Sequence, residues 1–214
     1  METYEIINVI VGIASAFFFL ITAVGAIIAV FQLREMKRQA KQKTTVNIMI
    51  KWCNAISKET SFAENIVENF TKSQCEALYN REPFDVDIET KEKLCVTLCP
   101  NHGKEHDCKK CKETKSLEVS DLLLQELRWH IICYLNALET VMIAWKHKSV
   151  YDETILEQFS SFYDPSRKRN ILEEFRKVAG GGKSYPVINS FCDDLKAKYE
   201  KENPNALGKT TRGN

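Results

Sequence analysis

Four cysteines in the middle of the chain have the spacing of a metal site. They form a CxxxC pair, Cys95 and Cys99, and a CxxC pair, Cys108 and Cys111, joined by an eight-residue loop. Zinc prefers four thiolate or imidazole ligands at tetrahedral corners, and cysteines two to four residues apart can supply two of them from one turn. The spacing therefore predicts a structural zinc ion on these four cysteines.

Other chemistries are open at the same segment. His102 and His106 lie in the loop and are alternative ligands for one of the cysteines. Four available thiolates favour a closed structural site, because catalytic zinc needs an open coordination position. Release of zinc on thiol oxidation is a redox alternative, since Lys109 and Lys110 favour the thiolate form. Acidic residues among the lysines, and the lack of an aromatic residue for base stacking, argue against nucleic-acid binding.

The charge of the chain is unevenly distributed. Its 214 residues carry 30 Lys plus Arg and 29 Asp plus Glu, so the net charge of +1 gives no general reason to bind nucleic acid. Yet no charged side chain lies between Glu5 and Arg34. As a helix, the apolar run over residues 6–31 is about 39 Å long, against about 30 Å for the hydrocarbon core of a bilayer. We predict a transmembrane anchor over residues 1–33.

The flanks of this run predict its orientation. The preceding segment, METYE, has no Lys or Arg, unlike the basic start of a cleaved signal peptide. The following segment carries Glu35 among five bases: Arg34, Lys37, Arg38, Lys41 and Lys43. The positive-inside rule then predicts a single-pass protein of the inner (cytoplasmic) membrane, with its N-terminus outside and its C-terminal domain in the cytoplasm. The bases would also hold a juxtamembrane helix, residues 34–60, against the lipid surface of the bilayer.

Small residues recur within the span. Gly12 and Ala16, and Gly25 and Ala29, are four residues apart, a spacing that lets two membrane helices approach closely. This pattern makes a homo-oligomer through the transmembrane helix one hypothesis. No ionisable residue lies inside the span, which argues against a transporter but leaves open a pore formed by several chains.

Helical periodicity continues through the rest of the chain. The first helix is expected to run on without a break, with an apolar stripe of Val46, Met49, Ile50, Cys53 and Ile56 beside Trp52. Ser61 and Glu64 have the spacing of a capping box for the next helix, and Asp87 can cap a short helix towards Cys99. Residues 117–148 contain the most apolar stretch, a stripe broadened by Trp129 and Trp145: Leu124, Leu127, Ile131, Leu135, Leu138 and Met142.

Three further helices are expected towards the C-terminus. The first carries Ile155 and Phe159, the second starts at residues 164–165 and ends at the glycines 180–182, and the third starts at residues 185–186. With no convincing strand, the fold class is all-α: a long transmembrane helix running into a helical bundle. We assign residues 61–202 to a cytoplasmic helical domain with a zinc-binding insertion at 95–111, and residues 203–214 to a flexible tail.

Other candidate sites are weaker. The GGGKS segment at residues 180–184 lacks the first glycine and the preceding strand of a phosphate-binding loop. Arg128, Asn136 and Glu139 interrupt the central apolar helix, where a structural pair or a cap to a neighbouring helix is favoured over a ligand site. His130 reads as a structural histidine. Because no nucleophile–base arrangement can be defended, the chain is predicted not to be an enzyme.

The remaining cysteines are scattered. In a cytoplasmic domain they do not suggest disulfides. Cys53, Cys133 and Cys192 lie on apolar helical stretches, and all four, with Cys75, are expected to be small core residues.

Two segments carry a resemblance to a known family. They are AVGAIIAVFQLREMKRQAKQ (residues 23–42) and YLNALETVMIAWKHKSVYDETILEQF (residues 134–159), and they resemble the bacterial membrane proteins grouped as domain of unknown function 4760. The resemblance implies a single-pass anchor with a cytoplasmic helical domain and brings no catalytic residues. The family pattern has no zinc cluster, so residues 95–111 are interpreted as an insertion.

Two classes of function follow. The first is a membrane-anchored interaction or sensing module that binds an unknown protein or small ligand and is stabilised by structural zinc. The alternative is a membrane-perturbing effector, of the kind used in anti-phage defence, whose transmembrane helices oligomerise when the cytoplasmic domain senses a signal.

Overall fold

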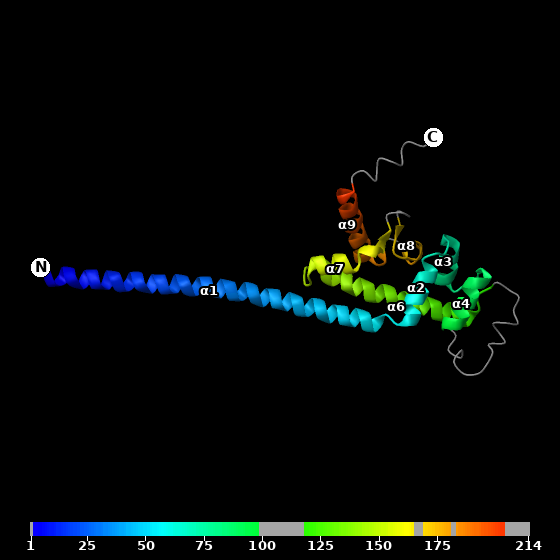
Figure 1. Ribbon diagram of the computed structural model, residues 1–214, viewed down its shortest axis with the longest axis horizontal. Coiled ribbons are helices and arrows are strands. Elements are labelled where there is room, and N and C mark those ends of the chain that lie inside the picture. The colour runs from blue at the N-terminus through cyan, green and yellow to red at the C-terminus, as the bar shows by residue number, and fades with distance from the viewer. Residues whose placement is uncertain (1, 99–117, 165–168, 181–182, 204–214) are drawn as a thin grey trace, which may run out of the picture. The chain divides into compact units, whose positions relative to one another are not determined.

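The computed structural model describes residues 2–98, 118–164, 169–180 and 183–203, which are helical almost throughout (Figure 1). The chain divides into two units, Met1–Thr45 and Val46–Asn214. Helix α1, Glu2–Ala55, forms the first unit and continues into the second without a break, as predicted. The all-α fold class is confirmed.

The first unit is an apolar helix with its side chains exposed. Within α1, residues Gly12–Ala55 include a window with a mean hydropathy of 2.5, and none of that window is buried. Phe17, Phe18 and Phe19 are 64%, 73% and 78% exposed. Among the described residues this is the one helix with the length and composition of a membrane span or a signal sequence.

The second unit contains seven further α-helices among the described residues. They are α2 (Lys58–Val67), α3 (Lys72–Asn80), α4 (Ile88–Leu98), α6 (Asp121–Lys146), α7 (Asp152–Gln158), α8 (Glu173–Val178) and α9 (Pro186–Glu202). A short 3-10 helix, η1 (Ser160–Phe162), leads into two antiparallel two-residue strands, β1 (Tyr163–Asp164) and β2 (Arg169–Asn170). A pair this short does not change the all-α class.

Helix α6 is the centre of the hydrophobic core, as its periodicity predicts. The six residues of its predicted stripe are each at most 1% exposed. Helices α2, α4 and α9 pack against it, and the Trp145 ring lies edge-on to Phe191 with 4.9 Å between ring centroids. The prediction for Trp129 is wrong, because its side chain is 62% exposed.

The apolar stripe at the end of α1 faces the core in a different register from the predicted one. Val46, Ile50 and Cys53 are exposed, while Ile48, Met49, Trp52 and Ile56 pack against the core. Both sets have helical spacing, so periodicity alone does not choose between them. The contacts of Trp52 determine which stripe of α1 faces the core, because its ring packs edge-on against Tyr134 and Phe159, each at a centroid distance of 5.3 Å.

Two predicted helix starts are wrong. Helix α2 starts earlier than predicted, because the Ser57 hydroxyl accepts a hydrogen bond from the Thr60 N–H at 3.2 Å and caps it. The capping box in this region is formed by Thr71 and Gln74 at the start of α3, a helix that was not predicted. Asp164 lies in β1, so α8 does not start there, and Pro165 falls outside the described residues.

Other helix ends agree with the prediction. Asp87 caps α4 by accepting from the Thr90 N–H at 2.8 Å, and Pro186 is at the first position of α9. The chain leaves α8 through Gly180, which has a φ of 125°, a conformation that favours glycine.

Candidate functional site

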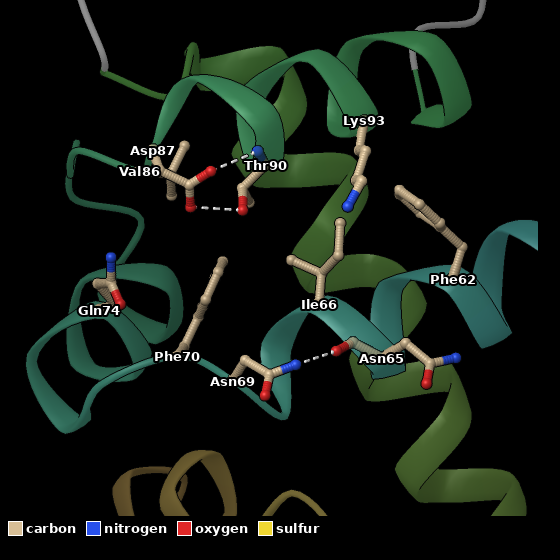
Figure 2. A pocket seen from close by; sticks show the side chains of 10 residues that line it. All are labelled: Phe62, Asn65, Ile66, Asn69, Phe70, Gln74, Val86, Asp87, Thr90 and Lys93. Atoms are coloured by element: carbon tan, nitrogen blue, oxygen red, sulfur yellow. Dashed lines mark hydrogen bonds between the residues drawn. The ribbon is translucent and has the colours of Figure 1, made fainter.

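A cleft of about 380 Å³ lies between α2, α3 and α4 (Figure 2). Phe70 and Val86 are buried at its base, and Ile66 and Phe62 are half-buried on its α2 side. The remaining lining residues are polar: Asn65, Asn69, Gln74, Asp87, Thr90 and Lys93. The cleft therefore combines an apolar base with a polar rim, the usual composition of a binding pocket.

The polar groups of the rim are fixed by local hydrogen bonds. Asn65 and Asn69 each donate to a carbonyl oxygen one turn earlier, at 2.9 Å. The Gln74 side chain donates to the Asp85 carbonyl at 2.9 Å, which ties α3 to the segment before α4. Lys93 forms an ion pair with Glu89 at 2.5 Å. The rim is thus arranged before any ligand binds.

Asp87 has a structural role at the rim. Its carboxylate accepts from the Thr90 hydroxyl at 2.6 Å as well as from the Thr90 N–H, and these bonds hold its pKa below the usual range. The residues lining the cleft include no cysteine, histidine or serine. The cleft has the chemistry to bind a ligand and contains no recognisable nucleophile–base pair.

A second group of polar residues lies inside the domain, where α8 and α9 begin. Each helix starts at a non-glycine residue with positive φ, Leu172 (46°) and Tyr185 (57°), and neither residue caps its helix with its own side chain. The Glu68 carboxylate accepts from the Leu172 N–H at 2.5 Å. The Glu139 carboxylate of α6 accepts from two N–H groups of α9, those of Val187 at 3.1 Å and Ile188 at 3.0 Å. Carboxylates from other parts of the chain therefore replace the missing caps.

Arg176 is the buried cation of this group. Its side chain is 2% exposed, its Nε donates to the Ile171 carbonyl at 2.9 Å, and its Nη1 donates to the Asn189 amide oxygen. Its Nη2 has no hydrogen-bond partner among the described residues. Burial lowers the pKa of Arg176, and the nearby acidic groups, including Glu68 and Glu139, oppose that effect. The guanidinium partly offsets the charge of the capping carboxylates.

Glu64 is a carboxyl with a strongly raised pKa. It lies on α2, one turn before Glu68, and burial together with the Glu68 charge raises its pKa to about 7. Burial also raises the pKa of the neighbouring Tyr134, with smaller contributions from both glutamates. Sequence reasoning missed this pair, because two glutamates four residues apart on an amphipathic helix look like a solvated face.

The predicted polar residues of α6 do not form one network. Glu139 caps a neighbouring helix, the favoured structural interpretation, whereas Arg128 donates from Nε to the Tyr79 carbonyl at 3.1 Å and Asn136 is exposed. His130 is a structural histidine, with Nδ1 at 3.0 Å from the Thr60 hydroxyl.

Of the predicted zinc ligands, Cys95 alone falls within the described residues. It is 5% exposed on the core-facing side of α4, beside Leu94 and Leu98. The other three, Cys99, Cys108 and Cys111, and the alternative ligands His102 and His106, lie outside the described residues. In the part of the chain that is described, no three His, Cys, Asp or Glu side chains are grouped to hold a metal ion. The zinc site stays a prediction.

The scattered cysteines differ in burial. Cys75 and Cys192 are buried and Cys133 is half-buried, whereas Cys53 is exposed, so its assignment to the core is wrong. The error has the same cause as the register error of α1.

Comparison with protein families identifies the chain. The model of a domain of unknown function, DUF4760, matches residues 19–186. The chain belongs to the DUF4760 family. The match begins within the apolar part of α1 and ends at the first residue of α9, so the DUF4760 region includes both the cleft and the capping glutamates. Comparison with curated proteins and with solved structures gave no match.

The raised pKa of Glu64 predicts a pH-dependent stability. The folded chain holds this proton up to about pH 7, against an ordinary value of 4.5, so stability falls as the pH rises between these values. We expect Glu64→Gln to stabilise the protein by about 1–2 kcal/mol at pH 8, after allowing for partial exposure, and to have little effect at pH 4.5. Thermal unfolding of the full-length protein in detergent, followed by circular dichroism, measures both.

Glu92→Gln is the matched control, because Glu92 is exposed on α4. It should leave the unfolding temperature unchanged at both pH values. An equal effect of Glu64→Gln at pH 4.5 and pH 8 would contradict the assignment.

Proposed function

We propose that the chain is a membrane-anchored interaction or sensing module. Helix α1 holds it in the bilayer, and the helical domain binds a protein or small ligand in the cleft between α2, α3 and α4. The observation that carries the anchor is the exposure of the whole apolar window of α1, which no other described part of the chain covers. Apolar surface of this extent is stable in hydrocarbon and costly in water.

The charges beside the span support an orientation with the domain in the cytoplasm, at the inner membrane. Arg34, Lys37, Arg38 and Lys41 follow the apolar run on α1. Glu35, the one acidic residue among them, forms an ion pair with Arg38 at 2.9 Å, so the segment keeps an excess of positive charge. Such an excess stays on the cytoplasmic side of bacterial membranes.

The cleft supports binding rather than catalysis. Its volume of about 380 Å³ suits a small ligand or a few side chains of a protein partner. Its apolar base provides contact area and its fixed rim provides directed hydrogen bonds, so little ordering is required on binding. We therefore regard the chain as a binding protein and not an enzyme.

Structural zinc at the segment after α4 is part of the proposal. The support is the spacing of Cys95, Cys99, Cys108 and Cys111, together with the place of Cys95 in the last turn of α4. An ion held there would join residues 95–111 to the domain.

One observation favours the effector alternative. A Cβ atom added at Gly25 of α1 would meet nothing within 4 Å, so packing within this chain does not require glycine there. With Ala29 four residues on, Gly25 forms a small patch on which a second α1 helix could pack closely. Association of this kind would bring several spans together in the bilayer.

The binding proposal predicts a specific cross-link from the cleft. A photo-reactive amino acid replacing Asn65 at the rim should capture a discrete partner in isolated inner membranes, and Ile66→Asp in the same chain should abolish the product. Mass spectrometry of the cross-linked product identifies the partner.

The orientation is tested with fusions to the C-terminus. A fluorescent-protein fusion should fluoresce and a phosphatase fusion should be inactive, because the domain is cytoplasmic.

The control places the same probe at Glu153, exposed on α7 and outside the cleft. Products that are equal from both positions, or unaffected by Ile66→Asp, would argue against the cleft. An active phosphatase fusion would reverse the orientation.

The effector alternative predicts growth arrest on induced expression of the full-length chain. Gly25→Leu should abolish the arrest, because the larger side chain prevents close helix contact, whereas Val24→Leu on the neighbouring face should not. Growth curves and membrane-potential dyes measure the effect. The absence of any growth effect under every trigger would leave the binding module as the sole function.

The zinc proposal predicts about one zinc ion per purified full-length chain, measured by metal analysis. Cys108→Ser should lower the zinc content strongly, because three thiolates bind more weakly than four. Cys133→Ser, at a half-buried position on α6, should leave it unchanged. A chain without stoichiometric zinc, or with the same content after Cys108→Ser, would exclude the site.

A further inference from the structure

A third surface feature lies where the end of α3 meets α6. It is a pocket of about 270 Å³, lined by Arg81, Gln125, Glu126, Arg128 and Trp129. Trp129 is 62% exposed, on a helix that otherwise buries ten residues. The pocket thus presents an exposed indole ring beside two arginines, and it shares no lining residue with the cleft.

Arg81 occupies an unusual backbone position. It ends α3 in the left-handed conformation, with φ 63° and ψ 35°, where glycine or asparagine is usual. Its side chain is exposed and makes no recorded hydrogen bond or ion pair with the described residues. Glycine would end the helix in this conformation with less strain than arginine, so ending the helix does not explain why an arginine is present. Its guanidinium is therefore available to a ligand.

Arg128 is held in place from one side. Its Nε donates to the Tyr79 carbonyl at 3.1 Å, and its guanidinium carbon lies 5.5 Å from the centre of the Tyr79 ring. These contacts fix the plane of the guanidinium without using Nη1 or Nη2, which have no recorded hydrogen bond to the described residues. A fixed guanidinium with free amino groups is suited to bidentate recognition of phosphate or carboxylate.

We propose that this pocket binds an anion that carries a flat aromatic ring, in chemical class a nucleoside phosphate. The ring stacks on Trp129, and the phosphate pairs with Arg81 and Arg128. Gln125 and Glu126 lie beside the indole and offer an amide and a carboxylate to the edge of the ring. The site is additional to the cleft, and its function goes beyond the proposed partner binding.

The size and charge of the pocket favour a mononucleotide over a nucleic-acid strand. Its volume is slightly below the usual range of ligand pockets, so it holds no more than one ring with one phosphate-bearing sugar. A protein that binds single strands needs a basic groove along several phosphates, whereas this pocket contains Glu126 and the chain has a net charge of only +1.

The test is calorimetric titration of the full-length protein in detergent with AMP, GMP, CMP and UMP as probes. At least one should bind saturably, and the matching nucleoside and inorganic phosphate should each bind at least about tenfold more weakly, because each lacks one of the two contacts. Absence of saturable binding by all four nucleotides would overturn the proposal.

Variants separate the two contacts. Trp129→Ala should weaken binding by about fivefold to a hundredfold, the range for loss of one stacked base. Arg81→Gly removes one of the two guanidinium groups while relieving the positive φ, so it should keep the fold and reduce the preference for nucleotide over nucleoside. Ile143→Ala, at another exposed position of α6, is the control and should bind as the unmodified chain does.

Equal affinities of the unmodified chain, Trp129→Ala and Arg81→Gly would assign any nucleotide binding to another place and overturn this one. The cross-link from Asn65 is measured separately, so failure of the nucleotide site and failure of the cleft are distinguishable.

Discussion

The C-terminal part of the domain depends on carboxylates that cap helices other than their own. Helices α8 and α9 begin at Leu172 and Tyr185 in left-handed conformations, and their first N–H groups bond to Glu68 and Glu139. A buried N–H without a partner costs about 1–3 kcal/mol, so these bonds join both helices to the rest of the domain. Both carboxylates are half-buried, and the buried Arg176 lies near enough for their charges to act on it, which partly compensates them. Apolar contact alone would hold α9 against α6 without fixing where the helix begins.

Helix α6 combines three roles. Ten of its residues are buried in the core, Glu139 caps α9, and Arg128 and Trp129 line the surface pocket. Because a helix packed on three sides by α2, α4 and α9 cannot rotate without disrupting the core, the positions of Glu139 and Trp129 are fixed together. The same packing that stabilises the domain thus positions its cap and its surface pocket.

The elements predicted correctly are those with a strong periodic signal. These elements depend on neighbouring residues alone, so a local pattern is enough to predict them. They are the stripe of α6, the uncharged run of α1, Asp87 before α4 and Pro186 at the start of α9. Predictions were wrong where two local patterns were equivalent. Ser57, Ser61 and Thr71 can each cap a helix, so their residue types do not show which of them does. Two apolar stripes at the end of α1 have the same period, and the tertiary contacts of Trp52 determine which stripe faces the core. The partners of Glu68 and Glu139, at Leu172 and Val187, are distant in the chain, and no local pattern indicates them.

Helix α4 connects the cleft with the cysteine segment. Thr90 and Lys93 line the cleft (Figure 2). Leu94, Cys95 and Leu98 of the same helix pack into the core. A change at the end of this helix therefore acts on one wall of the cleft, since a short helix moves as a rigid unit. Under the proposed zinc ligation, the ion would be attached to that wall through Cys95. In that case the ion would act on the cleft through α4 without contacting the ligand, which would connect the proposed zinc site with the proposed role in recognition.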